Sequence, residues 1–344
     1  MSVPRATLAP DYEISRLIKG GWHLAGGHGD IDRHQAIADM AAFVEAGITT
    51  FDCADIYTGV EALIGDFRRA HPSLARRTQV HTKFVPDLAD LAQVDRAYVE
   101  RTVDRSLARL GVERIDLVQF HWWDFATPGY VEAALELERQ RRAGKIRNVA
   151  VTNFDTPHLA ELIEAGAPIF AHQLQYSLLD TRPDSGMAAY CAEKGVHLLC
   201  YGTVAGGFFS ERWLDRPAPR GDLGNRSLVK YRLIVEEFGG WALFQQLLGA
   251  LSDIAAKHGA DIATIATRAV LDRPGVAAAI VGATNRTHLA AHVGIGEVKL
   301  DDADRAAIES VCKLKKGPGG DVYALERDRK GPHGRIMKYE LNNA

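Results

Sequence analysis

The chain has 344 residues, of which 47% are hydrophobic and 25% charged, with a formal net charge of −3. This composition is ordinary for a globular enzyme, and the charge gives no electrostatic reason to expect a nucleic acid or an anionic membrane as partner. The first residues carry no apolar segment of a secretory signal, and no apolar run approaches the ~18 residues of a membrane span. Four cysteines without a CxxC pattern predict reduced, buried thiols, so a cytoplasmic protein is expected.

Short apolar strands alternate with amphipathic helices along most of the chain. The first strand is expected to end near Gly21, and the second spans Thr49 to Phe51. The others are expected at residues 79–83, 115–120, 147–153, 170–175, 196–201 and 276–281. Eight such strands joined by helices predict a parallel sheet closed into a (β/α)8 TIM barrel.

Capping residues and glycines mark the expected helices between these strands. Asp32 is expected to cap a helix that Gly47 ends, and Asp95 one that Gly111 ends. Further helices are expected at residues 131–143, from Thr156-Pro157, after an interruption over residues 202–241, from Ile262 and from Thr284.

A single barrel domain is predicted over residues 1–315, because no composition shift or linker interrupts it. Residues 316–320, KGPGG, form a flexible joint, and residues 316–344 form a charged, weakly apolar tail. The tail folds over the barrel mouth, packs on a partner subunit or is partly disordered, and the sequence leaves these three alternatives open.

Four polar side chains stand where consecutive predicted strands end. Asp52 ends the second strand with Tyr57 just beyond it, Lys83 ends the third strand, and His121 closes the fourth. Consecutive strands of a barrel are neighbours, so these side chains are expected to meet at one rim. A buried lysine lowers the pKa of a nearby tyrosine, an aspartate balances the lysine, and a histidine can donate a hydrogen bond to a carbonyl oxygen. The set predicts protonation of an oxyanion after hydride delivery.

The segment FDCADIY at residues 51–57 resembles the aldo-keto reductase motif, in which a strand ends in aspartate and a tyrosine follows. Lys83 in His-Thr-Lys-Phe and His121 in Asp-Leu-Val-Gln-Phe-His resemble the other two catalytic positions of that family. The resemblance extends over about residues 16–293. It implies that Tyr57 is the general acid, that Lys83 tunes it, that Asp52 pairs with Lys83, and that His121 orients and polarises the carbonyl.

The family uses a nicotinamide cofactor, and the resemblance implies where it binds. Thr152, Asn153 and Gln173 match the positions that hold the carboxamide, and Tyr201 matches the ring that stacks on the nicotinamide. Residues 202–210 resemble the loop around the pyrophosphate, where small residues let backbone N–H groups approach phosphate oxygens. The contacts expected in this part of the site are Gly21, Trp22, Asp52, Thr152, Asn153, Gln173, Tyr201, Gly202, Thr203, Val204, Ala205, Gly207, Arg212 and Arg226.

Residues 280–289 resemble the segment that binds the adenosine phosphate at the start of a helix. Relatives often carry Arg or Gln at the position of His288, and Glu-Asn where this chain has Ala291-His292, which places the preference for NADP over NAD in doubt. Arg286 suits a 2′-phosphate, so NADP(H) is favoured while NAD(H) stays open. The expected contacts are Gly282, Ala283, Thr284, Arg286, His288 and His292.

The substrate site is expected beside Tyr57 and His121, where Trp22, Trp122 and Trp123 lie at predicted strand ends. Aromatic walls suit a small carbonyl compound with an apolar or planar part, and core or tail packing is the alternative for these rings. No metal is expected. His288 and His292 have the spacing of a zinc-binding helix, but the glutamate of an HExxH motif and a third ligand do not accompany them.

The sequence therefore predicts an NAD(P)H-dependent aldo-keto reductase that reduces an aldehyde or ketone to an alcohol. Two alternatives stay open: oxidation of an alcohol or sugar-like hemiacetal, and a cofactor-binding regulatory subunit. A Rossmann dehydrogenase is disfavoured because the segment at residues 27–32, GHGDID, lacks the third glycine of GxGxxG. A metal-dependent barrel hydrolase is disfavoured because clustered ligands are not found. The oligomeric state is not predicted.

Overall fold

Eight parallel strands close into a barrel in the computed structural model, which describes residues 3–26, 31–221 and 223–342. Each strand pairs with the next along the chain, and the last pairs with the first from Ala279–Leu17 to Gly282–Gly20. The predicted (β/α)8 barrel is thus confirmed. The barrel strands are β3 (Leu17–Gly20), β4 (Thr50–Asp52), β5 (Gln79–Phe84), β6 (Ile115–Phe120), β7 (Ile146–Thr152), β8 (Ile169–Gln175), β9 (His197–Tyr201) and β10 (Val276–Gly282).

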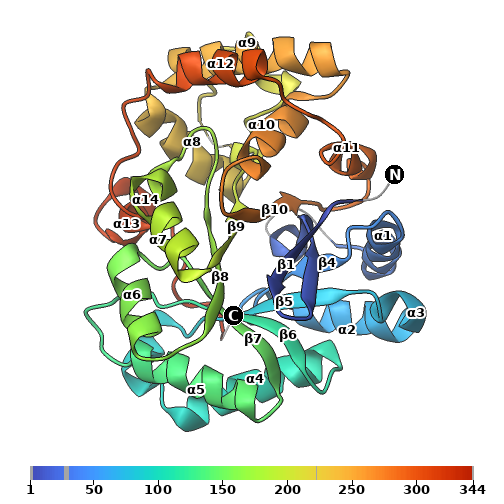
Figure 1. The fold of residues 1–344 in the computed structure, drawn as a ribbon, viewed down its shortest axis with the longest axis vertical. Coiled ribbons are helices and arrows are strands. Elements are labelled where there is room, and N and C mark those ends of the chain that lie inside the picture. Colours follow the sequence, from blue (N-terminus) through green and yellow to red (C-terminus); the bar gives the residue numbers. More distant parts are fainter. Residues whose placement is uncertain (1–2, 27–30, 222, 343–344) are drawn as a thin grey trace.

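Helices surround the barrel (Figure 1). Two expected caps are present, because Asp32 accepts hydrogen bonds from the backbone N–H groups of His34 and Gln35, and Asp95 accepts one from Tyr98. The longer helices are α1 (Arg33–Glu45), α2 (Val60–Ala70), α4 (Arg96–Leu110), α5 (Tyr130–Arg142), α6 (Thr156–Glu164), α7 (Met187–Lys194), α8 (Arg226–Phe238), α9 (Trp241–His258), α10 (Ile262–Leu271) and α12 (Asp302–Cys312). Shorter ones are α3 (Pro72–Ala75), α11 (Leu289–Gly294), α13 (Ala324–Arg327), α14 (Pro332–Arg335) and the 3-10 turns Trp22–Leu24, Leu88–Gln93, Arg182–Ser185, Ala205–Gly207 and Glu211–Trp213.

An N-terminal hairpin, which the sequence did not predict, closes the floor of the barrel. Its strands are β1 (Arg5–Ala9) and β2 (Tyr12–Ser15), and they pair antiparallel. The Tyr12 hydroxyl and His81 Nε2 lie 2.9 Å apart inside the barrel. Apolar hairpin side chains form one buried cluster with the interior of the strands, and its buried members are Leu8, Ala9, Tyr12, Ile14, Ile18, Leu117, Ala150, Ala171, Leu199, Ala277 and Ala278.

Near the cofactor-binding segments one local prediction was incomplete and another was wrong, although the helix expected after the interruption does begin at Trp241 as α9. The interruption expected over residues 202–241 contains α8, whose N-cap Asn225 accepts a hydrogen bond from Leu228 N. The helix expected from Thr284 begins only at Leu289. The side chain of Asn285 accepts a hydrogen bond from Thr287 N at 2.9 Å, so a local turn replaces the first helical turn.

The C-terminal tail runs along the rim where the barrel strands end. Near its start, the side chain of Asp321 accepts a hydrogen bond from Thr156 N at 2.8 Å. Near its end, the Tyr339 carbonyl accepts one from Leu88 N at 3.0 Å, and Asn342 Nδ2 donates to Val85 O at 2.8 Å. These contacts place the tail over the carboxyl ends of β5 and β7, and α14 packs against α8 (Figure 1).

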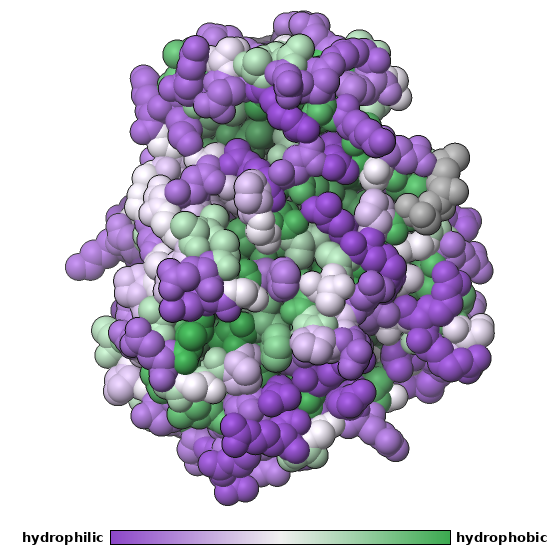
Figure 2. Space-filling view, in the orientation of Figure 1, coloured by the Kyte–Doolittle hydropathy of each residue, from purple (hydrophilic) through white to green (hydrophobic). Residues whose placement is uncertain are grey.

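The surface is mostly hydrophilic around the periphery of the face in Figure 2, and apolar residues show toward its middle. Leu135 and Leu314 are large hydrophobic residues with exposed side chains. No helix within the described ranges is long and apolar enough to cross a membrane. The segment GHGDID at residues 27–32, on which a Rossmann dehydrogenase was disfavoured, lies partly outside the described residues, which omit residues 27–30.

Candidate active site

The polar residues picked out in the sequence lie at the carboxyl ends of neighbouring strands. Asp52 is the last residue of β4, Lys83 is the last but one of β5, and His121 directly follows β6. Asn153 directly follows β7. Because the strands are parallel and adjacent, these residues share one rim of the barrel.

The ammonium group of Lys83 lies between a carboxylate and a phenol. Lys83 Nζ donates to Asp52 Oδ2 at 2.7 Å, to Cys53 O at 2.9 Å and to the Tyr57 hydroxyl at 3.5 Å. The side chains of Lys83 and Asp52 are only 6% and 5% exposed. Burial alone would lower the pKa of Lys83, but the charge of Asp52, the neighbouring Tyr57 and the hydrogen bond to Asp52 together raise the pKa above its ordinary value. The lysine therefore stays charged.

Tyr57 keeps its proton in this environment. Burial raises the pKa of Tyr57 above its ordinary value, and the charge of Lys83 opposes that rise only in part. The expectation that Lys83 lowers the tyrosine pKa is therefore right in direction for that one interaction but not for the net shift. Trp22 packs its ring edge against Tyr57, with ring centroids 5.2 Å apart. A protonated phenol is the form that a general acid needs.

Two glutamines hold the second oxygen of Asp52. Gln119 Nε2 donates to Asp52 Oδ1 at 2.9 Å, and Gln173 Nε2 donates to the same oxygen at 2.6 Å and to Gln119 Oε1 at 2.8 Å. The sequence analysis did not single out Gln119, although an uncharged polar residue within a buried apolar strand was the available signal. The carboxylate is thus fixed by three donors, which orients it toward Lys83.

His121 is held in one tautomer by a backbone carbonyl. His121 Nδ1 lies 3.1 Å from Thr152 O, and because a carbonyl can only accept, Nδ1 carries the hydrogen. Burial, and next the charge of Arg327, lower the pKa of His121 to about 3, so the ring is neutral. Nε2 therefore has a lone pair, and it is buried without a hydrogen-bond partner. The expectation that His121 donates to a carbonyl is not met by this tautomer, because its one hydrogen is used on Thr152.

Aromatic rings surround His121, but one expected wall residue lies elsewhere. Trp123 is perpendicular to the His121 ring at 4.3 Å between centroids, and Tyr323 from the tail lies at 5.6 Å. Trp122 instead is fully buried, packs on Phe120 and donates from Nε1 to Thr127 O at 3.0 Å. Successive side chains of an extended segment alternate in direction, so His121 and Trp123 face the mouth while Trp122 enters the core. Trp122 is thus a core-packing residue, which is the alternative that the sequence analysis left open for these tryptophans.

At the next strand ends, side chains complement a carboxamide. Asn153 Oδ1 accepts a hydrogen bond from the Tyr201 hydroxyl at 2.8 Å, which leaves Nδ2 as a donor. Gln173 uses its amide hydrogens on Asp52 and Gln119, which leaves Oε1 as an acceptor. A donor beside an acceptor is the pattern that a carboxamide matches, so this donor set fits the nicotinamide group of a dinucleotide.

The loop after β9 packs tightly on α8. A side chain on Gly202 or Gly206 would overlap Tyr231, and both glycines have left-handed backbones, with φ 79° and 64°. Thr203 is buried, with its hydroxyl 3.1 Å from that of Thr267, and Ala205 is buried beside it. The remaining expected residues are the half-buried Val204 and Gly207, the exposed Arg212, stacked 4.9 Å from the Trp213 ring, and Arg226, which opens α8.

The expected adenosine end lies between β10 and α1. Gly21 directly follows β3, and Gly282 is the last residue of β10, the strand paired with β3. Beyond it, Ala283 is buried and Thr284 is exposed. Arg286 is 60% exposed, with Nε 3.5 Å from Asp39 Oδ1 of α1. The rings of His288 and His292 lie 6.4 Å apart. Across the described part of the chain, no group of three or more His, Cys, Asp or Glu residues is placed to hold a metal.

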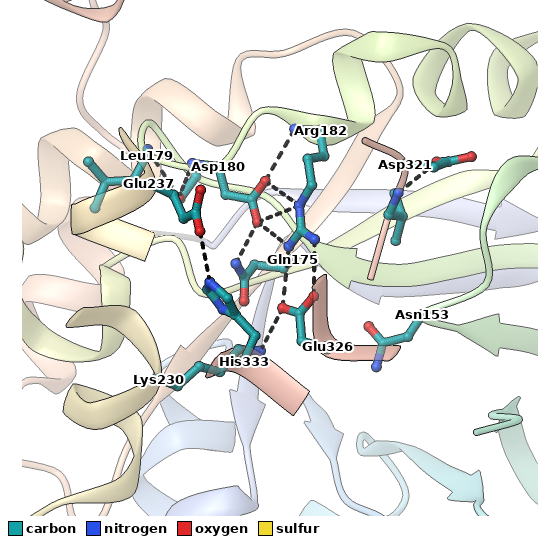
Figure 3. A network of polar contacts seen from close by, with 12 residues as sticks. Asn153, Gln175, Leu179, Asp180, Arg182, Lys230, Glu237, Asp321, Glu326 and His333 are labelled. Atoms are coloured by element: carbon teal, nitrogen blue, oxygen red, sulfur yellow. Dashed lines mark hydrogen bonds and ion pairs between the residues drawn. The ribbon is translucent and has the colours of Figure 1, made fainter. Parts of the chain in front are cut away.

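The tail adds a buried ionic network to the same rim (Figure 3). Glu326 pairs with Arg182 at 3.0 Å and with Lys230 at 3.6 Å, and Arg182 also pairs with Asp180 at 2.7 Å. Lys230 Nζ lies 5.1 Å from the centre of the Tyr201 ring. Burial alone would raise the pKa of Glu326, but Lys230 and Arg182 lower it to about 2. The sequence did not single out these residues, because charged residues far apart along a chain are ordinarily solvated.

A closed (β/α)8 barrel with an aspartate, a tyrosine, a lysine and a histidine on its carboxyl rim defines the class of barrel oxidoreductases that the sequence resembles. Independently, the profile of the Aldo/keto reductase family matches residues 16–313. The chain therefore belongs to this family and is an NAD(P)-dependent oxidoreductase.

Known proteins of similar sequence include one that is named an aldo-keto reductase. Flagellar radial spoke protein 5 of Chlamydomonas reinhardtii is 29% identical over 69% of this chain, which spans only 56% of that protein. Aldo-keto reductase YhdN of Bacillus subtilis (strain 168) is 27% identical, over 88% of this chain and 91% of the relative. The NADH-specific methylglyoxal reductase of Escherichia coli (strain K12) is 23% identical, over 88% of this chain and 96% of the relative.

Solved structures show the same fold. The glycerol dehydrogenase AKR11B4 from Gluconobacter oxydans has a TM-score of 0.76 at 24% identity, over 90% of this chain and 94% of the other. A thermostable aldo-keto reductase in complex with the inhibitor epalrestat has a TM-score of 0.71 at 24% identity, over 89% of this chain and 98% of the other.

Proposed function

We propose that the protein reduces an aldehyde or a ketone to an alcohol with NAD(P)H, and that Tyr57 is the general acid. The observation that carries this proposal is the placement of Lys83 Nζ between Asp52, at 2.7 Å, and the Tyr57 hydroxyl, at 3.5 Å. When bound, the nicotinamide supplies the hydride to the carbonyl carbon. Family membership supports carbonyl chemistry at the coarser level.

Each member of this set has a part in moving one proton. The O–H bond of Tyr57 breaks as its proton goes to the oxygen that gains negative charge, and the phenolate left behind faces the ammonium of Lys83. Asp52 keeps Lys83 charged and directed at the phenol.

His121 orients the substrate oxygen rather than supplying its proton. Its Nε2 lone pair can accept a hydrogen bond from the hydroxyl that forms when Tyr57 gives up its proton. Trp22 and Trp123 form aromatic walls on either side of the two groups, through their contacts with Tyr57 and His121. A small carbonyl compound with an apolar or planar part fits such walls.

The cofactor is proposed to lie across the ends of β7 to β10. Asn153 and Gln173 hold the carboxamide, with Thr152 beside them, and the Tyr201 ring supports the nicotinamide. The loop from Gly202 to Gly207, with Arg212 and Arg226, is proposed for the pyrophosphate. Gly282, Ala283, Thr284, Arg286, His288 and His292 are proposed for the adenosine end. NADP(H) is favoured because Arg286 is exposed and can turn from Asp39 to a 2′-phosphate, and NAD(H) is the alternative.

The same residues serve the reverse reaction, in which Tyr57 accepts a proton from an alcohol or a sugar-like hemiacetal. The acceptor Nε2 of His121 supports alcohol oxidation as the second candidate, because an alcohol substrate offers this nitrogen an O–H donor. We further propose residues 1–315 as the oxidoreductase domain and residues 316–344 as a cover for its mouth. Four free buried cysteines support a reducing, cytoplasmic compartment.

The test follows consumption of NADPH and of NADH with a reactive aromatic aldehyde. Wild type is expected to turn over, and Tyr57→Phe is expected to lose at least about a hundredfold in kcat. Tyr190→Phe, which removes a hydroxyl from α7 away from the rim, is the matched control and should retain wild-type activity. If wild type binds cofactor but reduces nothing, alcohol oxidation is measured next, and absence of both activities favours a cofactor-binding regulatory protein.

A further inference from the structure

The guanidinium of Arg327 joins two loops of the active-site rim. Nη1 donates to the carbonyl oxygens of Trp122 at 2.6 Å and Trp123 at 2.8 Å, and Nη2 donates to that of Asn153 at 2.6 Å. The guanidinium also lies over the ring of Phe125, 3.9 Å from its centre. A rigid planar fork with several donors suits such a bridge, because one group reaches oxygens of both loops at once.

The three bridged carbonyls belong to segments that carry reacting groups. Trp122 and Trp123 directly follow His121. Asn153 has a left-handed backbone, with φ 60°, which surrounding contacts have to maintain. Its N–H donates to Gln173 O at 2.9 Å, so Arg327 and Gln173 hold the residue from its two ends. The distance between the substrate side and the cofactor side of the mouth therefore depends on Arg327.

The tail has other anchors, so it stays docked without this guanidinium. Figure 3 shows Glu326, the preceding residue, held by ion pairs with Arg182 and Lys230. Further along, Asn342 N donates to Asp87 Oδ1 at 3.1 Å. Loss of the Arg327 side chain would free the two loops from each other while these contacts remain.

We propose that Arg327 is a positioning residue of the active site, which holds the loop of His121 and the loop of Asn153 at the separation that hydride transfer requires. The proposal rests on the function proposed above, in which the carbonyl and the nicotinamide meet between these loops. A displacement of about 1 Å at such a site can cost roughly a hundredfold in rate. Arg327 acts through the loops and touches neither reactant.

Four variants separate the bridge from the tail, and the last of them, Arg327→Ala, serves for rescue by guanidinium. Arg327→Met removes the donors, Arg327→Lys keeps the charge without the planar fork, and Arg329→Met is the matched control. Arg329 lies in the same tail and pairs with Asp124 at 3.3 Å, but its side chain is 56% exposed. We expect kcat of Arg327→Met to fall by about tenfold to a hundredfold with a much smaller change in KM, Arg327→Lys to recover only part, and Arg329→Met to match wild type. Millimolar guanidinium should restore part of kcat in Arg327→Ala.

Two readouts distinguish this proposal from a structural role and from failure of the proposed function. A lower Tm with unchanged kcat, or a loss that guanidinium does not restore, would show that Arg327 only anchors the tail. If wild type turns over no carbonyl or alcohol, the proposed function fails, and the role of Arg327 is then tested by measuring NADPH binding. Arg327→Met should then weaken binding by about threefold to tenfold, measured by tryptophan fluorescence, whereas unchanged binding overturns the proposal. Should Arg327→Met not fold, Arg327→Lys carries the same comparison.

Discussion

Replacing Asp52 by asparagine removes the counter-charge of Lys83 with little change in shape. The ammonium of Lys83 then keeps Cys53 O, at 2.9 Å, and the Tyr57 hydroxyl, at 3.5 Å, as uncharged partners and loses its carboxylate. With the two side chains only 5% and 6% exposed, water cannot replace the lost carboxylate. Breaking a buried pair by removing one partner costs about 3–5 kcal/mol of unfolding free energy. Asp52→Asn should therefore unfold at about 1 to 2 M less urea than wild type.

The assay is equilibrium unfolding in urea, followed by tryptophan fluorescence, with a surface pair as control. Arg232 and Glu236 form an ion pair at 3.0 Å on α8 with side chains 30% and 51% exposed. Glu236→Gln should cost less than about 1 kcal/mol, because solvent screens such a pair. A loss for Asp52→Asn as small as for Glu236→Gln would refute the reasoning, since it would mean that Lys83 tolerates burial without its carboxylate.

Two further predictions concern stability. The free energy of unfolding should decrease as pH falls from about 6.5 toward 4, because buried histidines must stay neutral in the folded chain while the unfolded chain binds protons below about 6.5. Burial first of all lowers the pKa to about 4 for His81 and His292 and to about 3 for His121 and His172. Urea titrations at several pH values measure the effect, and a flat profile over this range would contradict it. Gly65→Ala should lower the free energy of unfolding by about 1–3 kcal/mol, because the added Cβ would overlap the Arg109 carbonyl. Gly249→Ala, with open space around the added Cβ, should be neutral or stabilising by up to about 1 kcal/mol. Equal melting temperatures for the two variants would argue against this reasoning.

The barrel and the polar residues at its strand ends could be predicted because both follow from local sequence patterns. Strand length, alternation with helices and capping residues such as Asp32 and Asp95 are encoded within short windows. Asp52 and Lys83 stand out because a charge at the end of an apolar strand needs a partner, and parallel neighbouring strands supply it. Their convergence is a property of the barrel, so identifying the fold from the sequence also placed these two residues together.

Other parts of the site depend on contacts that no short window contains. The tautomer of His121 is set by the carbonyl of Thr152, a backbone atom on another strand, and so its acceptor nitrogen could not be anticipated. Glu326 is among the most deeply buried charges, yet its partner Arg182 lies 144 residues away in the chain. Charged residues in a tail are ordinarily read as solvated, and only the folded arrangement shows that they pair inside the mouth.

The hairpin beneath the barrel has a consequence for redesign of the fold. The strands present small side chains, including Ala150, Ala171 and Ala278, to the same buried cluster that receives Ile14 and Tyr12 of the hairpin. The interior volume is therefore shared between two segments, and interiors are packed to nearly constant density. An enlarged alanine in the strands should be accommodated only with a smaller side chain in the hairpin. The hairpin and the strands together therefore fill the floor of the barrel, so its redesign requires paired substitutions, one in each segment.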